Sequence, residues 1–336
     1  MARAAPVKRD RSDLKRHQAA NRREYHAMTH PILGNLRLPL MCAPMSFASS
    51  VDLAVACSKA GVVAGWQGGV YTRMEEFARY LAALDGIEGA SPIVNMPARW
   101  GTDPVAAERL ALLERYRVPL VLSSLGDPSA LVERVHGWGG RVIHDVVTMR
   151  HAEKAIAAGA DGLMLTCAGA GGHTGFLTPM AFVPAVRRIF KGLLIVAGGI
   201  ADAHGMLAAL ALGGDLACMG TRFIATPESG VLEGHRAMIP TVGADDIVVS
   251  AAMNGVPAHW MRQSIERVGL DHKTLPNVRT ALPDGVKAWR DIWSAGQSAG
   301  LIDRVESVAA LVDRLAGEFE ALEGVPDWRA RLARIR

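Results

Sequence analysis

The stretch of the chain best suited to chemistry is a glycine-rich run that contains a histidine. It reads Ala-Gly-Ala-Gly-Gly-His-Thr-Gly over residues 168–175. Four glycines let the backbone lie flat against a ligand, and the imidazole of His173 can exchange a proton near neutral pH, because an unperturbed histidine has a pKa of about 6.5. A histidine that only bonds a neighbouring loop is the alternative, and it suits most of the other histidines. The surrounding glycines favour a catalytic acid or base at His173.

Two further glycine turns follow apolar runs later in the chain. Ala197-Gly198-Gly199 ends one run, and Gly220-Thr221 ends the next. Glycines there would let backbone N–H groups approach a phosphate closely. The alternative is that Gly198 and Gly199 only relieve crowding between a strand and a helix. We predict a phosphate site, because these turns follow the seventh and eighth expected strands, where (β/α)8 barrels commonly bind phosphate.

Eight short apolar runs, separated by helical patterns, would position these residues. The runs are continuous rather than alternating, which indicates strands buried on both faces, as in a parallel sheet. They span residues 38–43, 62–66, 92–96, 119–123, 141–146, 162–167, 193–198 and 216–221. Helices are expected at 52–60, 74–84, 104–116, 128–135, 149–158, 182–190 and 202–212. This alternation predicts an α/β fold, a (β/α)8 TIM barrel with a C-terminal helical and lid extension.

Local signals mark the ends of several of these helices. Asp103-Pro104 and Asp127-Pro128 have the order of an N-cap followed by a proline in the first turn. The glycines placed to end helices are Gly61, Gly159 and Gly213.

A doubly wound sheet is the alternative fold, because it shares the strand–helix alternation. It would usually carry a GxGxxG turn after its first strand, and residues 43–47 contain no glycine.

The pattern changes outside the barrel. Residues 1–30 hold eight Lys and Arg against three Asp and Glu, and we expect a basic leader without fixed structure. Residues 227–284 are predicted to form an inserted lid of helices and loops. The barrel domain is then 31–226 plus 285–325, and it ends in a helix whose apolar face runs from Val305 to Leu322, with Asp303 and Glu306 as a capping arrangement.

The composition of the chain restricts the classes of molecule that the protein is expected to bind. The net charge of +4 comes from the leader, so the nearly neutral remainder gives no reason to expect nucleic acid. No apolar run reaches the roughly 18 residues of a membrane span. The four cysteines have no CxxC or zinc spacing, which favours reduced thiols in a cytoplasmic protein without a metal site. We therefore expect a small-molecule substrate, with no nucleic-acid and no membrane partner.

Taken together, these motifs resemble those of the nitronate monooxygenase family, formerly called 2-nitropropane dioxygenases. Residues 171–175 (GGHTG) are similar to the family's GGHxG stretch. Residues 43–45, Asn95, the two glycine turns and the segment 293–303 agree with the family in order and spacing. The resemblance covers about residues 36–325 and implies an FMN-dependent (β/α)8 oxidoreductase.

The resemblance also implies roles for individual residues. His173 would be the catalytic acid or base near the reactive edge of the flavin, deprotonating a carbon acid or steering its anion. The residues implied to bind FMN are Ala43, Pro44, Met45 and Ser46 along the isoalloxazine, Asn95 at the ring, Gly171 and Gly172 beside it, and Ala197, Gly198, Gly199, Gly220 and Thr221 at the phosphate.

One position departs from the family pattern. Some relatives carry a lysine after the histidine that ends strand five, where this chain has Asp145 after His144. A carboxylate there would disfavour an anionic reduced flavin and repel an anionic nitronate, or it would contact the ribityl hydroxyls of FMN. Capping of the helix that starts near Met149 is the alternative for Asp145.

Three functions remain open at this stage. The first is oxidation of a nitronate or nitroalkane by O2, giving a carbonyl compound and nitrite, with FMN supplying the redox chemistry. The second is reduction of a quinone or an enoyl thioester by NAD(P)H, which the same barrel would serve. The third is a non-redox isomerase or aldolase. An aldolase would normally need a Schiff-base lysine at a strand end. The following lysines are instead expected in helices or connecting loops: Lys59, Lys154, Lys191, Lys273 and Lys287. The sequence leaves the oligomeric state open and is compatible with a homodimer.

Overall fold

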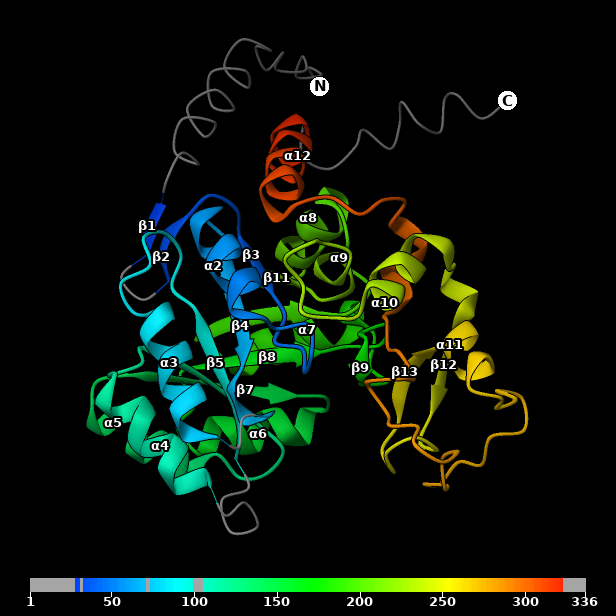
Figure 1. Cartoon of the computed structure of the whole chain (residues 1–336). Coiled ribbons are helices and arrows are strands. Elements are labelled where there is room, and N and C mark those ends of the chain that lie inside the picture. Colours follow the sequence, from blue (N-terminus) through cyan, green and yellow to red (C-terminus); the bar gives the residue numbers. More distant parts are fainter. Residues whose placement is uncertain (1–27, 31–32, 71–72, 99–104, 323–336) are drawn as a thin grey trace, which may run out of the picture.

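The computed structural model describes residues 28–30, 33–70, 73–98 and 105–322. Within them, eight parallel strands close into a barrel in the order β3, β4, β5, β6, β7, β8, β10, β11 (Figure 1). The predicted (β/α)8 barrel is confirmed, and each strand overlaps an apolar run of the sequence. The strands are β3 Leu40–Cys42, β4 Val63–Gln67, β5 Ile93–Pro97, β6 Leu120–Ser124, β7 Arg141–Val146, β8 Gly162–Thr166, β10 Leu193–Ala197 and β11 Leu216–Met219.

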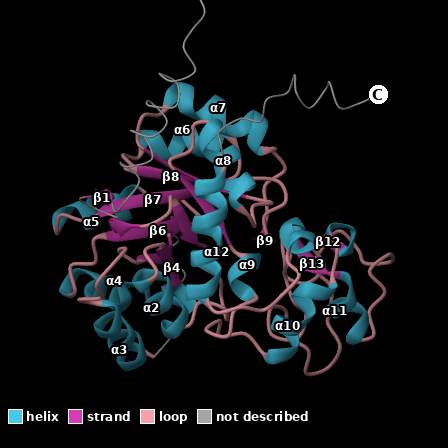
Figure 2. Ribbon diagram, turned by 90° about the horizontal axis from the view of Figure 1, so that it is seen from above, coloured by secondary structure: helices cyan, strands magenta, loops and turns pink. Residues whose placement is uncertain are grey.

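Helices surround the strands, as the view along another axis shows (Figure 2). They agree with the seven expected helices to within about three residues at each end. They are α2 Val51–Lys59, α3 Met74–Leu84, α4 Ala106–Arg115, α5 Ser129–Gly137, α6 Met149–Ala157, α7 Pro179–Ile189 and α8 Ala203–Ala211. None of the described helices is both long and apolar enough to cross a bilayer.

The predicted helix ends follow the expected chemistry. Gly61, Gly159 and Gly213 have φ angles of +79°, +84° and +109°, a backbone conformation that glycine adopts without strain. The Asp127 carboxylate accepts the backbone N–H of Ser129 at 2.9 Å, at the start of α5. The Asp103-Pro104 pair lies outside the described residues.

The strands are apolar on both faces because the barrel has two cores. Met41, Ile143 and Ile195 belong to the core inside the barrel. Their strand neighbours Val142 and Val196 belong to the core between the strands and the surrounding helices. Successive side chains of a strand point to opposite faces, so both faces must be apolar. Polar side chains remain at the strand ends, where the site is built.

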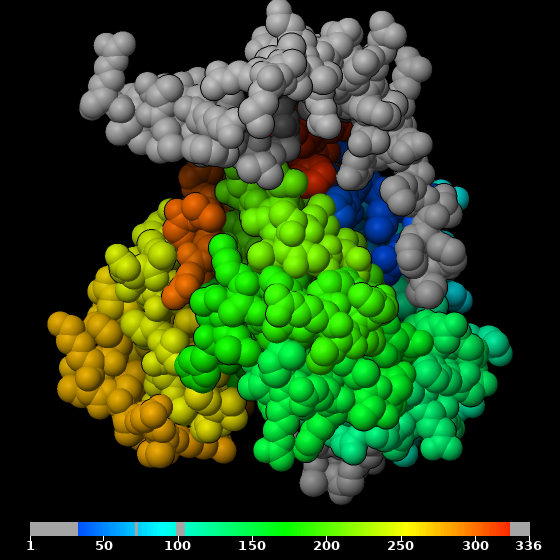
Figure 3. Space-filling model, turned by 180° about the vertical axis from the view of Figure 1, so that it is seen from behind, coloured from blue at the N-terminus to red at the C-terminus, as the bar shows by residue number. Residues whose placement is uncertain are grey.

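A subdomain of residues 227–292 lies beside the rim of the barrel, and Figure 3 shows its yellow and orange surface next to the green surface of the barrel. The expectation of helices and loops alone was wrong here, because β12, β13 and the short strand β9 form a three-stranded sheet. Its elements are α10 Glu233–Met238, β12 Ile247–Ser250, β13 Ala258–Met261, α11 Arg262–Arg267, the 3-10 turns Ile239–Thr241 and Ala244–Asp246, and β9 Gly172–His173 from the barrel loop. The short helix α9 (Thr221–Ile224) follows β11 and precedes the subdomain.

The predicted boundary at residue 285, between the inserted lid and the barrel domain, also differs from the structure. Ile292 packs in the same apolar cluster as Trp260 of β13, so residues 285–292 belong with the subdomain. The chain returns to the barrel through residues 293–301, which include the 3-10 turn Gln297–Leu301.

The last described helix, α12 (Val308–Ala321), confirms the predicted C-terminal helix, which packs against α2 and α8. Its N-cap is Ser307, whose hydroxyl accepts the N–H of Ala310, and not Asp303 as expected. Glu306 instead accepts hydrogen bonds from Arg314 at 2.6 Å. Val305 precedes the helix and is exposed, so it does not contribute to the apolar face.

Residues 28–30 correct the expected extent of the leader. They form β1 (Met28–His30), which pairs antiparallel with β2 (Gly34–Leu36). The rest of the predicted leader, residues 1–27, lies outside the described residues. The turn Gly68–Val70 after β4 completes the described elements.

Candidate active site

A cavity of about 1560 Å³ opens at the carboxyl ends of the barrel strands and is closed on one side by the subdomain. All fourteen residues selected from the sequence line it, although they come from six different segments. They are Ala43, Pro44, Met45, Ser46, Asn95, Asp145, Gly171, Gly172, His173, Ala197, Gly198, Gly199, Gly220 and Thr221. Their roles toward a ligand remain predictions.

The loop after β3 is held against its neighbours by hydrogen bonds. The N–H of Ala43 donates to the carbonyl of Met219 at the end of β11 (2.9 Å). The N–H of Met45 donates to Ser49 Oγ at 2.7 Å, and that hydroxyl in turn donates to the carbonyl of Gly65 on β4 (3.3 Å). Residues 43–46 are thereby fixed along the cavity wall.

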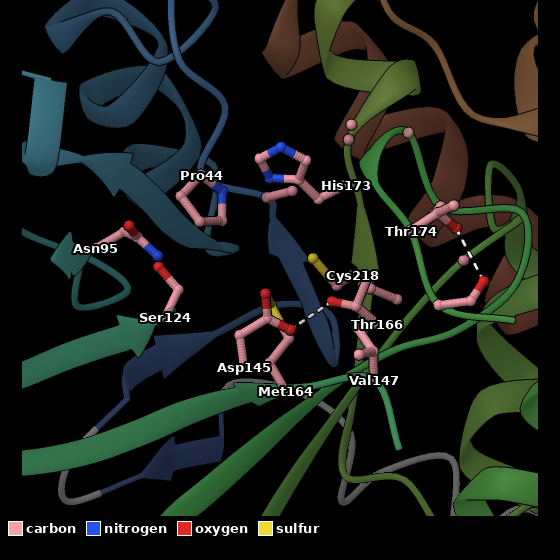
Figure 4. A pocket seen from close by; sticks show the side chains of 18 of the residues that line it. Pro44, Asn95, Ser124, Asp145, Val147, Met164, Thr166, His173, Thr174 and Cys218 are labelled. Carbon is pink, nitrogen blue, oxygen red and sulfur yellow. Dashed lines mark hydrogen bonds between the residues drawn. The ribbon is translucent and has the colours of Figure 1, made fainter. Parts of the chain in front are cut away.

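One wall carries polar groups at the ends of β4, β5 and β6. Asn95 is only 5% exposed and, with Ser124, faces the cavity (Figure 4). Gln67 lines the same wall, and its buried Oε1 has no hydrogen-bond partner among the residues that the structure describes. A buried acceptor without a donor is costly unless a ligand supplies an N–H group. Sequence reasoning missed Gln67 and Ser124, whose only signal was a polar side chain at a strand end.

The floor of the cavity carries a carboxyl group. Thr166 Oγ1 donates to Asp145 Oδ1 at 2.6 Å (Figure 4). Burial raises the pKa of Asp145 to about 6, with the Thr166 hydrogen bond acting against the rise. Asp145 does not cap α6, because the N-cap is Thr148, whose side chain accepts the N–H of His151. Its carboxyl group is thus left to face the cavity.

Replacing Asp145 by asparagine should stabilise the fold at high pH only. A carboxyl group whose pKa is higher in the folded chain than in the unfolded chain destabilises the fold progressively as pH rises from the unfolded value to the folded value. We expect a gain of about 2 kcal/mol in the free energy of unfolding at pH 8 and no difference below about pH 4. Urea unfolding at pH 4, 6 and 8 measures this.

The control is Asp127→Asn. Hydrogen bonds from Ser129 lower the pKa of Asp127, so this substitution should destabilise the fold as pH rises and leave it unchanged in acid. Equal effects of Asp145→Asn at pH 4 and pH 8 would contradict a raised pKa at Asp145.

The glycine-rich loop after β8 is clamped by the segment that returns from the subdomain. The N–H of Gly172 donates to Ser294 Oγ at 2.8 Å, and the N–H of Gln297 donates to the carbonyl of Gly169 at 3.0 Å. The two backbones touch, since a Cβ on Gly296 would lie 2.6 Å from Gly169 O. Behind this segment, His235 contacts the Ser294 carbonyl through Nε2 at 3.0 Å. Only a side-chain-free backbone can pass so close to the loop.

The turns after β10 and β11 leave backbone N–H groups facing the cavity. Gly199 has a φ of +71°, and a Cβ built there would meet no atom within 4 Å. Among the described residues, no protein acceptor is found for the N–H groups of Gly198 and Gly199. The Thr221 hydroxyl is already used, because it accepts the N–H of Gly296 at 2.8 Å. Free N–H groups on a concave turn suit a phosphate.

His173 lies where the barrel loop meets the subdomain. It is part of β9, which pairs with β13 in the register Ala258 to His173, and its imidazole extends over the cavity (Figure 4). Asn254 Nδ2 lies 2.9 Å from His173 Nε2, and Trp289 packs edge-on against the ring at 5.5 Å between centroids. Partial burial lowers the pKa of His173, which favours the neutral imidazole.

A sequence profile of the nitronate monooxygenase family matches residues 72–318, which is most of the chain. The chain belongs to the nitronate monooxygenase family. This membership makes it an enzyme of the flavin-dependent oxidoreductase class and confirms the resemblance found in the sequence.

Several relatives show how broad this similarity is. The chain is 30% identical to a nitronate monooxygenase from Paraburkholderia phytofirmans over 70% of this chain and 71% of that protein. It is 27% identical to an octahydro-indene-carboxyl-CoA dehydrogenase from Mycobacterium tuberculosis over 68% of this chain, a match that spans 64% of that relative's length. Among solved structures, FabK from Thermotoga maritima has a TM-score of 0.72 at 28% identity, covering 88% of this chain and 96% of that one.

The residues on the cavity wall fit a bound flavin. The unpartnered Gln67 acceptor and the buried Asn95 amide would meet the polar edge of the ring system, which carries carbonyl and N–H groups. The free N–H groups of Gly198 and Gly199 would meet a phosphate on the opposite part of the wall. The cavity exceeds the roughly 300–1,000 Å³ of an ordinary ligand pocket, so it has room for a cofactor and a substrate together.

Proposed function

We propose that this protein oxidises nitronates or nitroalkanes with O2, using FMN as its cofactor. The single observation that carries the proposal is the convergence on one cavity of free N–H groups, an unpartnered acceptor at Gln67 and the imidazole of His173. FMN supplies the transfer of electrons from substrate to oxygen when it is bound. The four cysteines are buried free thiols, which supports the predicted cytoplasmic location.

The protein's own groups would bind the flavin, orient the substrate and exchange a proton with it. Gly198, Gly199 and Gly220 would hold the phosphate, and residues 43–46 with Asn95 would hold the ring. His173 would bond the oxygen of the substrate or exchange its proton from the subdomain side of the cavity. The apolar subdomain wall would exclude water, which strengthens every polar contact inside.

A second function is favoured by the shape and chemistry of the cavity mouth. Large apolar side chains from four separate loops line it although they are exposed to solvent, with Phe176 at 72% exposure. Exposed apolar groups around a cavity usually mark a binding surface. The other three are Phe47, Leu125 and Val256. Such a mouth would accept the apolar body of a thioester or quinone, and reduction of such a substrate by NAD(P)H is the alternative function.

Anaerobic reduction of the bound flavin separates the two functions. The purified yellow protein is mixed in a stopped-flow instrument with a nitronate, NADH or NADPH, and bleaching is followed. Bleaching by the nitronate, followed by nitrite release in air, supports the proposal. Bleaching by NADH or NADPH without any response to nitronates would make the reductase the correct function.

A further inference from the structure

The amide of Asn254 is held in one orientation by the backbone. Its Oδ1 accepts the N–H of Val256 at 3.1 Å. A backbone N–H can only donate, so the atom facing it must be the amide oxygen. The Nδ2 group is therefore the one that lies 2.9 Å from His173 Nε2. Because Nδ2 can only donate, Nε2 must accept.

A histidine that accepts at Nε2 carries its proton on Nδ1. The neutral imidazole has one N–H and one lone pair, and the contact with Asn254 uses the lone pair. Among the described residues, Nδ1 of His173 has no hydrogen-bond partner, and the ring lines the cavity. Nδ1–H is thus the group that a substrate would meet. No basic lone pair of His173 faces the cavity in this arrangement.

We infer that Asn254 is a positioning residue that fixes His173 in the Nδ1–H tautomer, so that His173 acts as a hydrogen-bond donor toward the substrate. This inference rests on the proposed function for its catalytic consequence. A donor binds the oxygens of a carbon acid that is already ionised, and it does not remove the proton of a neutral one. The enzyme should then prefer preformed nitronates to neutral nitroalkanes.

Contacts on the far side of the ring keep this arrangement in place. Trp289 packs edge-on against His173 and at 4.3 Å between centroids against Trp260 of β13. Trp289 has a φ of +69°, a conformation that a non-glycine residue adopts only where its surroundings impose it. The charged or titratable groups on the elements around His173 are His259 on β13, Arg279 against Gly255, the Arg290–Asp291 pair beside Trp289, and Asp145 on the cavity floor.

The tautomer can be measured directly in the flavin-loaded protein. Labelling with 15N-histidine distinguishes protonated from unprotonated ring nitrogens, and the His173 signals are assigned with His173→Gln. We expect Nδ1 protonated and Nε2 unprotonated at pH 7. In Asn254→Asp a carboxylate faces Nε2, which should protonate both nitrogens and raise the pKa of His173 by about 1 to 3. Asn277→Asp adds the same charge on an exposed loop of the subdomain and should leave the signals unchanged.

A second measurement tests the consequence for the substrate. Asn254→Leu removes the donor, so a lone pair becomes available to the cavity in a fraction of the molecules. The ratio of kcat/KM for a nitroalkane to that for its nitronate should rise about tenfold.

Protonation of Nε2 in the wild type, or an unchanged His173 titration in Asn254→Asp, would overturn the inference. If the 15N pattern is as expected but no variant oxidises a nitronate, the tautomer assignment stands and the proposed function is the part that fails.

Discussion

The substitution Gly296→Ala is expected to abolish flavin binding and to lower the melting temperature. The added Cβ would lie 2.6 Å from Gly169 O and 2.8 Å from Gly171 N, both backbone atoms that no side-chain rotation can move. The glycine-rich loop would have to shift into the cavity. Overpacking of this kind costs about 3 kcal/mol, which corresponds to roughly 4–5 °C in a chain of this size.

The matched control is Gly317→Ala in α12. A Cβ on Gly317 would meet no atom within 4 Å, and alanine is favoured over glycine inside a helix by about 0.5–1 kcal/mol. This variant should therefore be slightly more stable and fully yellow. Flavin absorbance after gel filtration and thermal unfolding are the measurements. A yellow Gly296→Ala protein of normal stability would mean that the close backbone contact does not exist in solution.

The substitution His173→Gln is expected to reduce kcat by about 10²–10³-fold while the protein stays yellow, because it removes a fixed N–H donor aimed at the substrate. The imidazole lines the cavity from β9 and is not among the turns proposed to hold the phosphate, so flavin retention should not depend on it. Glutamine preserves a polar side chain of similar reach, but its flexible amide does not hold an N–H group at the position of Nδ1–H of His173.

Kinetics and flavin content must be measured on the same preparation. His204→Gln, on the exposed outer side of the barrel in α8, is the control and should keep wild-type kinetics. Unchanged turnover in His173→Gln would remove this residue from the proposed chemistry. Loss of colour would instead assign it to cofactor binding.

The barrel could be predicted because its signals are local. Each βα unit repeats the same pattern of a short apolar run, a turn and an amphipathic helix, and Gly61 and Gly159 with their positive φ angles follow the ends of helices. Once the order of strands was known, the position of Gly198 and Gly199 after the seventh strand placed them at the rim with Gly220. The site residues could therefore be gathered without coordinates.

The subdomain could not be predicted because its structure depends on contacts distant in sequence. The strands β12 and β13 have four residues each, and β13 is completed by Gly172 and His173 from the barrel loop. Asn254 carries no motif, and only the pairing of these strands brings it to His173. The same holds for the Gln67 acceptor, whose importance follows from the lack of a partner rather than from its type.

The pairing of β9 with β13 joins His173, which belongs to a loop of the barrel, to the subdomain, and the cavity lies between these two parts. A swing of the subdomain away from the rim would break this pairing and withdraw Asn254 and Trp289 from the ring in the same movement. A molecule open for ligand exchange would then lack an ordered imidazole. An open cavity and an ordered His173 would then exclude each other. Bound reactants would not meet a correctly placed imidazole while solvent can enter the cavity.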